Sequence, residues 1–131
     1  MQDNFKLEII SPEKVIFSDS VNTITLPSYE GDMSILKSHI SIITFLRPGI
    51  INIQKNDGNI EKFYTEDGTV EFFNDSLVLL SSSAENIKNL SRESIDKLSQ
   101  DAQKRLAEKN ITDHERYVLN HKIDALKEIR V

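Results

Sequence analysis

Short apolar runs separated by turn-forming residues fill the first two thirds of this 131-residue chain. Phe5, Leu7 and Ile9 alternate with charged residues, and a period of two is typical of a half-buried β-strand. Pro, Gly, Asn and Asp stand between the later runs, most clearly in the hairpin signal at residues 56–59. Short strands with turns at this spacing predict a β-sandwich or barrel. The later runs occupy residues 15–17, 21–26, 33–36, 40–46, 50–54, 60–65, 70–73 and 77–80.

The periodicity changes after residues 81–83, where apolar residues begin to recur at spacings of three and four. Ser91 is a suitable N-cap for a first helix, and Asn110 is its expected end. Thr112 and Glu115 have the spacing of a capping box, which predicts a second helix after a connection of only about two to three residues. So short a connection makes the helices antiparallel neighbours. The apolar stripes are Ile95, Leu98, Ala102 and Leu106 in the first helix, and Val118, Leu119, Ile123, Ala125, Leu126 and Ile129 in the second.

Composition and charge divide the chain at the same place. All glycines, prolines and phenylalanines precede Ser81, whereas the remainder is rich in Lys, Glu, Ala, Leu and Asn. Residues 1–84 carry 6 basic and 12 acidic side chains, and residues 85–131 carry 10 and 9. We therefore expect an all-β N-terminal sandwich or barrel in residues 1–84 and an antiparallel α-helical hairpin in residues 85–131, with strands and helices segregated.

Several classes of protein are disfavoured by the same composition. The net charge of −5 opposes nonspecific binding to nucleic acid or to an anionic membrane, since both require a basic protein surface. The sequence has no cysteine, which removes disulfides and thiolate chemistry. No apolar run reaches the roughly 20 residues of a membrane-spanning helix. The first four residues carry no export or import signal, so we expect the protein to stay in the compartment where it is made.

Residues 29–53 hold two turns that fix three strands in sequence. Gly31 can adopt the positive φ of a tight reversal, and Pro48-Gly49 fits the centre of a type II turn. The pattern extends to Leu7, Ser11, Phe17-Ser18, Glu30-Gly31, Ile35-Leu36, His39, Leu46, Pro48-Gly49, Tyr64, Gly68 and Glu71. This arrangement resembles the epsilon subunit of the F-type ATP synthase, and the resemblance covers nearly the whole chain.

The resemblance implies a subunit of the central stalk, or rotor, with no catalytic site of its own. Such a subunit couples proton-driven rotation of the c ring, through the gamma subunit, to ATP synthesis on the catalytic alpha and beta subunits. It also implies that the helical hairpin can reach alpha and beta and restrain ATP hydrolysis. The protein would lie at the cytoplasmic face of the bacterial inner membrane, as a peripheral subunit that meets the membrane only indirectly through the complex.

Partner contacts with the c ring and gamma are implied at Glu30, Gly31, Asp32 and Met33, and at His39. We call residues 29–33 the acidic turn. Its two carboxylates would meet basic side chains on the loops of the c ring, and charges of this kind guide orientation more than they supply affinity. The alternative interpretation of the same residues is an ordinary solvated turn, with His39 as a turn or interface histidine.

Some members of the family bind ATP through an Ile-Asp-x-x-Arg-Ala segment of the hairpin. Ile95 and Asp96 match its start, but Ser99-Gln100 replaces the arginine and alanine. Serine cannot replace the forked, permanent charge that a guanidinium offers to a phosphate. Arg105 lies in another register of the helix. We therefore expect no cofactor, and Ile95, Asp96 and Arg105 are the candidate contacts for a bound nucleotide.

Two other classes of function fit parts of the pattern. A free-standing β-sandwich could bind sugars or peptides and carry the hairpin as an adaptor. A small hydrolase would use His39 with Asp32, although no nucleophile motif surrounds them. A metal ion shared by His114 and His121 is disfavoured, because seven helical residues span roughly 10 Å.

Overall fold

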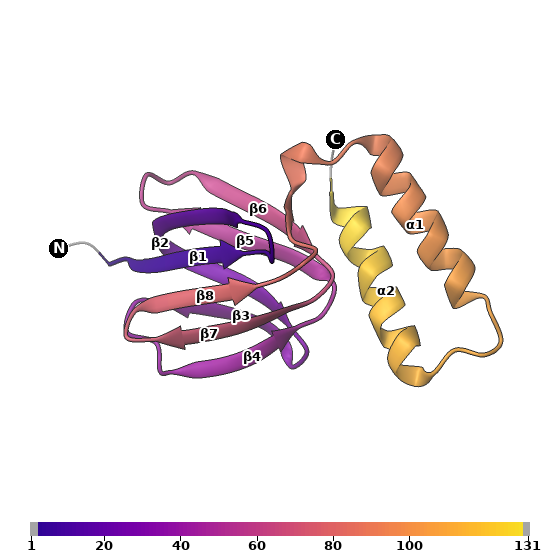
Figure 1. The fold of residues 1–131 in the computed structure, drawn as a ribbon, viewed down its shortest axis with the longest axis horizontal. Coiled ribbons are helices and arrows are strands. Elements are labelled where there is room, and N and C mark those ends of the chain that lie inside the picture. Colours follow the sequence, from indigo (N-terminus) through magenta and orange to yellow (C-terminus); the bar gives the residue numbers. More distant parts are fainter. Residues whose placement is uncertain (1–2, 130–131) are drawn as a thin grey trace.

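The computed structural model describes residues 3–129, and Figure 1 shows β-strands followed by two helices. Residues 1–2 and 130–131 lie outside the described residues. The first two belong to residues 1–4, for which the sequence predicts no targeting signal. The predicted fold class is confirmed, since a β-sandwich is followed by an antiparallel helical hairpin. The elements are β1 Phe5–Ile10, β2 Val15–Ser28, β3 Gly31–Leu36, β4 Ile42–Leu46, β5 Gly49–Lys55, β6 Ile60–Thr65, β7 Gly68–Phe73, β8 Ser76–Leu80, β9 Glu85–Asn86, the short 3-10 helix η1 Ile87–Asn89, α1 Arg92–Leu106 and α2 Asp113–Glu128.

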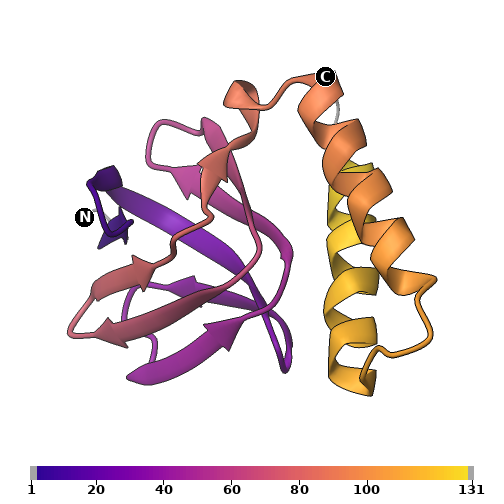
Figure 2. The same cartoon turned by 45° about the vertical axis from the view of Figure 1, so that its right-hand side comes forward.

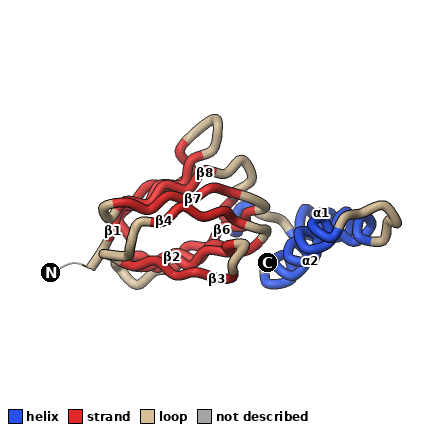
Figure 3. The backbone as a smooth tube through the Cα atoms, turned by 90° about the horizontal axis from the view of Figure 1, so that it is seen from below, coloured by secondary structure: helices blue, strands red, loops and turns tan. Residues whose placement is uncertain are grey.

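The strands form two stacked layers, which can be followed in Figure 3. The first layer has the order β1-β8-β7-β4, and the second is built around β2, which pairs with β3 and β5. β6 and then β9 extend the second layer beyond β5. β2 also pairs with β1 along its first half and with β4 at Ser28, so both edges of the first layer are joined to the second. Among the strands described, only β1 and β8 run parallel.

Alternating side chains from the two layers meet in one apolar core. Phe5 and Phe72 pack edge-on with ring centroids 5.6 Å apart, and Phe17 packs on Phe63 at 5.8 Å. The period-two pattern of the first strand is confirmed, because its apolar positions are the buried ones. The buried core comprises Phe5, Leu7, Ile9, Val21, Ile24, Leu26, Ile35, Leu46, Ile51, Ile53, Phe63, Val70, Phe72, Leu77, Leu79 and Ala84.

β2 is longer than its apolar pattern indicates. The runs at residues 15–17 and 21–26 belong to one strand, with exposed Ser18, Asp19 and Ser20 between them. The backbone of these three residues pairs with β1 while their side chains face solvent. Hydrophobic periodicity cannot detect such a segment, because backbone pairing does not require apolar side chains.

The two glycines of the 29–53 stretch have different roles. Gly31 has a φ of +116°, which confirms the predicted tight reversal. Gly49 does not have a positive φ, so the predicted type II turn at Pro48-Gly49 is wrong. Gly49 instead begins β5 where space is lacking, since a Cβ there would lie 2.4 Å from the Cβ of Pro27.

Both predicted helix starts are confirmed, because Ser91 caps α1 and Thr112 caps α2, each within a reciprocal capping box. α1 ends at Leu106 rather than near Asn110, so residues 107–112 form a longer connection than predicted. The helix ends with its apolar stripe, because no residue from 107 to 110 is buried. The two helices still pack as antiparallel neighbours (Figure 1).

The chain passes from sandwich to hairpin through ordered structure. β9 pairs with β6, and η1 follows directly before the cap of α1. The side chain of Asn86 accepts a hydrogen bond from Lys88 N at 3.0 Å, which starts η1. The expected boundary between residues 84 and 85 stays a prediction.

Gly49→Ala is expected to lower the free energy of unfolding by about 1 to 3 kcal/mol, the usual cost of overpacking. The new methyl group would overlap the rigid ring of Pro27, which cannot swing away as a flexible side chain can. Urea unfolding followed by circular dichroism measures the change. Lys62→Ala, at an exposed position of β6, is the control, and equal effects of the two substitutions would contradict this explanation.

Candidate functional site

The helical hairpin covers part of the outer face of the second layer, as Figure 2 shows. Ile50 of β5 and Tyr64 of β6 are cross-strand neighbours that pack against the hairpin rather than into the sandwich core. Tyr64 is only 3% exposed. We call this contact the docking interface. Its buried members are Tyr64, Leu90, Ile95, Ala125, Leu126 and Ile129, with Ile50, Ile87 and Leu98 packed against them.

A charged contact lies beside the docking interface. Lys122 Nζ of α2 lies 3.1 Å from Glu66 Oε2, and the lysine side chain is 17% exposed. The Tyr64 hydroxyl donates a hydrogen bond to the same oxygen at 3.2 Å. Burial, and then the charge of Glu66, raises the pKa of Tyr64, so its phenol stays protonated and remains a donor. Glu66 is therefore held by one group from the sandwich and one from the hairpin.

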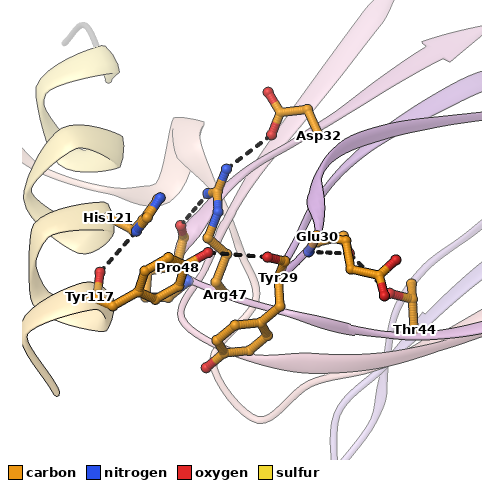
Figure 4. Close-up of polar contacts among 9 residues, drawn as sticks. Tyr29, Glu30, Asp32, Thr44, Arg47, Pro48, Tyr117 and His121 are labelled. Carbon is orange, nitrogen blue, oxygen red and sulfur yellow. Dashed lines mark hydrogen bonds and ion pairs between the residues drawn. The ribbon is translucent and has the colours of Figure 1, made fainter. Parts of the chain in front are cut away.

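Tyr29 connects the acidic turn to α2 (Figure 4). Its ring stacks on Tyr117 with centroids 5.7 Å apart and on His114 at 6.0 Å. The Tyr117 hydroxyl donates a hydrogen bond to the Tyr29 carbonyl oxygen at 3.3 Å. His121 contacts the Tyr117 ring at a centroid distance of 4.2 Å, and its Nδ1 donates to the Tyr117 carbonyl at 2.8 Å. We call these four residues the aromatic bridge.

The backbone of the acidic turn is fixed from inside the sandwich. Glu30 N donates a hydrogen bond to Ser28 Oγ at 3.2 Å. Ser28 Oγ in turn shares a buried hydrogen bond with Thr44 Oγ1 of β4 at 3.0 Å. The turn is therefore anchored to both layers, because Ser28 belongs to β2 and Thr44 to β4.

The side chains of the acidic turn divide between solvent and core. Glu30 and Gly31 are exposed, and the side chain of Asp32 is 71% exposed. Asp32 pairs with Arg47 Nη2 at 3.2 Å, whereas Met33 packs against the core. Three of the four predicted contact residues of this turn thus lie together at the surface. Their contact with a partner stays a prediction.

His39 lies beyond the opposite end of β3 from the acidic turn. Its Nδ1 donates a hydrogen bond to the Ile40 carbonyl at 2.7 Å, and its ring packs edge-on against Phe72 at 5.9 Å. Asp32 and the end of β3 are about 13 Å apart at 3.3 Å per residue. Asp32 is moreover paired with Arg47. The geometry therefore contradicts a hydrolase that uses His39 with Asp32.

The three candidate nucleotide contacts lie at different places on α1. Ile95 is buried in the docking interface, and Asp96 Oδ1 lies 3.5 Å from Arg92 Nε. Arg105 lies about 13 Å further along the helix axis and is bound to Glu115 of α2 at 2.8 Å. This contact raises the pKa of Arg105 and lowers that of Glu115, so both stay charged near neutral pH. The absence of a bound nucleotide stays a prediction, and the pairing of Arg105 with Glu115 agrees with it.

Within residues 3–129, no three His, Asp or Glu side chains are placed to hold a metal ion. His114 and His121 are both part of the aromatic bridge. No helix in this part of the chain combines the length and the apolar character needed to cross a membrane.

The sequence interpretation missed a surface on the outside of the first layer. In residues 40–46 all positions except Ser41 and Thr44 are apolar, so the run does not alternate as a half-buried strand does. That run was the available signal, because a strand that is apolar on both faces needs cover on both faces. We call this surface the outer apolar face. Its members are Ile43 and Phe45 of β4, Phe73 of β7 and Leu80 of β8, which are 64%, 60%, 57% and 51% exposed.

Comparisons with known proteins match this fold over both of its parts. A family model for the beta-sandwich domain of the ATP synthase delta/epsilon chain matches residues 4–87. The ATP synthase epsilon chain of Pelagibacter ubique is 44% identical over 128 residues, which cover 97% of this chain and 98% of that relative. The ATP synthase epsilon chain of Rhizobium leguminosarum bv. trifolii is 26% identical over 130 residues, 99% of this chain and 96% of the relative. A chain of the Euglena gracilis mitochondrial ATP synthase, solved as OSCP/F1/c-ring, shares the fold with a TM-score of 0.79 at 17% identity, covering 97% of this chain and 81% of that one.

Lys122→Ala is expected to favour an undocked hairpin, because it leaves Glu66 without its counter-charge. For a partly exposed ion pair the loss is roughly 1 kcal/mol, or about fivefold in the ratio of docked to undocked chain. The sequence has no cysteine, so spin labels at Lys62→Cys in the sandwich and Lys109→Cys in the hairpin report docking through their distance distribution.

The control for this substitution is Lys97→Ala, which removes a lysine that is 78% exposed on α1. It should leave the distance distribution unchanged. A Lys122→Ala distribution identical to that of the parent chain would show that the ion pair does not hold the hairpin.

Proposed function

The chain belongs to the ATP synthase epsilon chain family, and from that premise we propose that it joins the c ring to the gamma subunit in the central stalk. In this role, proton-driven rotation of the ring reaches the catalytic alpha and beta subunits through gamma. The chain contributes mechanical coupling to the rotary complex and no catalytic group. A free-standing β-sandwich module has no comparable support, since the epsilon chain of Pelagibacter ubique matches over 97% of this chain, hairpin included.

The outer apolar face carries the proposal. Its four side chains lie on neighbouring strands, because β4, β7 and β8 are adjacent in the first layer. Soluble proteins rarely leave contiguous apolar patches open unless a partner covers them. Each large apolar side chain contributes about 1.5 to 3 kcal/mol when it is fully buried. We assign this face to gamma. The contact proposed for His39 lies apart from this face, because the His39 ring packs against Phe72, a buried core residue.

The acidic turn supplies the proposed ring contact. Glu30 and Asp32 are exposed on a turn whose backbone is set by the positive φ of Gly31 and by the hydrogen bond to Ser28. The inward packing of Met33 holds the start of β3 against the core. Basic side chains on the ring loops would meet these carboxylates, and such contacts set orientation and association rate.

The hairpin supplies the proposed restraint on ATP hydrolysis. In the structure it is docked on the sandwich, so reaching alpha and beta requires it to leave the docking interface. The apolar docking interface, one partly exposed ion pair and the aromatic bridge hold it there. An interface of this size leaves the two arrangements close enough in free energy for partners to shift the balance.

We place the complex at the cytoplasmic face of the bacterial inner membrane, with this chain attached through the ring and without lipid contact of its own. The net charge of −5 supports that placement, because anionic lipid headgroups repel an acidic protein. We further propose that the chain acts without a bound nucleotide. Ser99 stands where the segment would need an arginine, and Arg105 lies about 13 Å further along α1 and is bound to Glu115.

Ile43→Ser is expected to weaken binding to a gamma-containing catalytic complex by about tenfold or more, because it removes roughly 1.5 to 3 kcal/mol of apolar burial. Native mass spectrometry of titrated mixtures gives the stoichiometry and the dissociation constant. Ile60→Ser is the matched control, since Ile60 is 54% exposed against 64% for Ile43 but lies on β6 of the other layer. Unchanged binding by Ile43→Ser, or no binding by the folded parent chain, would overturn the proposal.

A further inference from the structure

Tyr29, the residue before Glu30, is hydrogen-bonded to both the sandwich and the hairpin. Tyr29 N donates a hydrogen bond to the Phe45 carbonyl of β4 at 3.1 Å, and the Tyr29 carbonyl accepts one from the Tyr117 hydroxyl of α2 at 3.3 Å. The ring of Tyr29 stacks on α2 as well, through Tyr117 and His114. A single turn residue therefore bridges the sandwich and the hairpin directly beside the exposed carboxylate of Glu30 (Figure 4).

The second carboxylate of the acidic turn also faces the hairpin. Asp32 and Arg47 line a cavity of about 200 Å³ whose opposite wall is α2, through His121, Asp124 and Glu128. Arg47 Nη1 donates a hydrogen bond to the Pro48 carbonyl at 2.9 Å while its Nη2 holds Asp32. The acidic groups of α2 thus line the same cavity as the guanidinium that positions Asp32.

Undocking would remove the constraints that come from α2. The Tyr29 carbonyl would exchange the Tyr117 hydroxyl for water, and the Tyr29 ring would lose both of its stacking partners. The turn would keep its anchor at Ser28 but sample more conformations. A partner that binds the looser turn must then supply the free energy needed to order it.

We infer that hairpin docking and occupancy of the acidic turn are thermodynamically linked. The docked hairpin preorganises Tyr29 and Glu30, so docking favours binding at the turn, and binding at the turn favours docking by the same factor. The inference rests on the proposed function, in which the occupant is the c ring with basic side chains on its loops. The position of the hairpin then depends on the ring contact. Where that contact has been lost, the hairpin undocks more readily and can restrain ATP hydrolysis.

Spin labels at Lys62→Cys and Lys109→Cys test the linkage in the assembled enzyme. The ratio of docked to undocked hairpin is compared between the enzyme with its ring and a catalytic complex without the ring. We expect the ratio to be about fivefold higher with the ring, at the lower end of typical coupling between sites. In Tyr117→Phe, which loses the hydroxyl donor and keeps the ring stack, this effect should shrink to about twofold or less.

Tyr64→Phe is the matched control, because it removes a hydroxyl from the docking interface without touching the acidic turn. It should change docking equally with and without the ring. No effect of an attached ring on docking, or the full effect in Tyr117→Phe, would overturn the linkage while leaving the proposed function intact. If Glu30→Gln with Asp32→Asn leaves ring attachment unchanged, the proposed ring contact itself fails.

Discussion

The burial of Tyr64 is the interaction on which the arrangement of the two parts of the chain depends. Tyr64 and Ile50 form an apolar strip on the outer face of β5 and β6, and the hairpin covers it. A buried tyrosine also needs a partner for its hydroxyl, which Glu66 provides, and Glu66 in turn attracts Lys122 of α2. Apolar burial and polar satisfaction thus require the same position of the hairpin. Docking therefore gives a defined arrangement rather than a loose association.

The two outer faces of the sandwich differ in what covers them, and this difference suits a subunit that connects the moving parts of a rotary complex. The face of β5 and β6 is covered by the hairpin of the same chain, while the face of β4, β7 and β8 keeps large apolar side chains in solvent. The acidic turn lies at the end of the sandwich that meets α2. One small chain thus combines an exposed apolar surface, a contact between its own two parts and an exposed acidic turn, which are the features that the proposed role uses.

Features that depend on residues close in sequence could be predicted, and features that depend on distant residues could not. The alternation from Phe5 and the caps at Ser91 and Thr112 rest on local rules, and the structure confirms them. The predicted type II turn at Gly49 is wrong because the need for glycine there comes from the close approach of Pro27, on another strand. The aromatic bridge joins residues 88 apart in sequence, and no local pattern indicates it. The outer apolar face has a signal in residues 40–46, but an apolar run by itself predicts a strand and does not show which of its faces stays exposed.

ATP-driven proton pumping by membrane vesicles, measured together with ATP hydrolysis, tests the coupling role most directly. Vesicles depleted of this chain are compared with the same vesicles after the purified chain is added back. If the chain joins the ring to gamma, adding it should raise the number of protons pumped per ATP hydrolysed several-fold. An equal ratio with and without the chain would contradict the account, because rotation would then reach the ring without it.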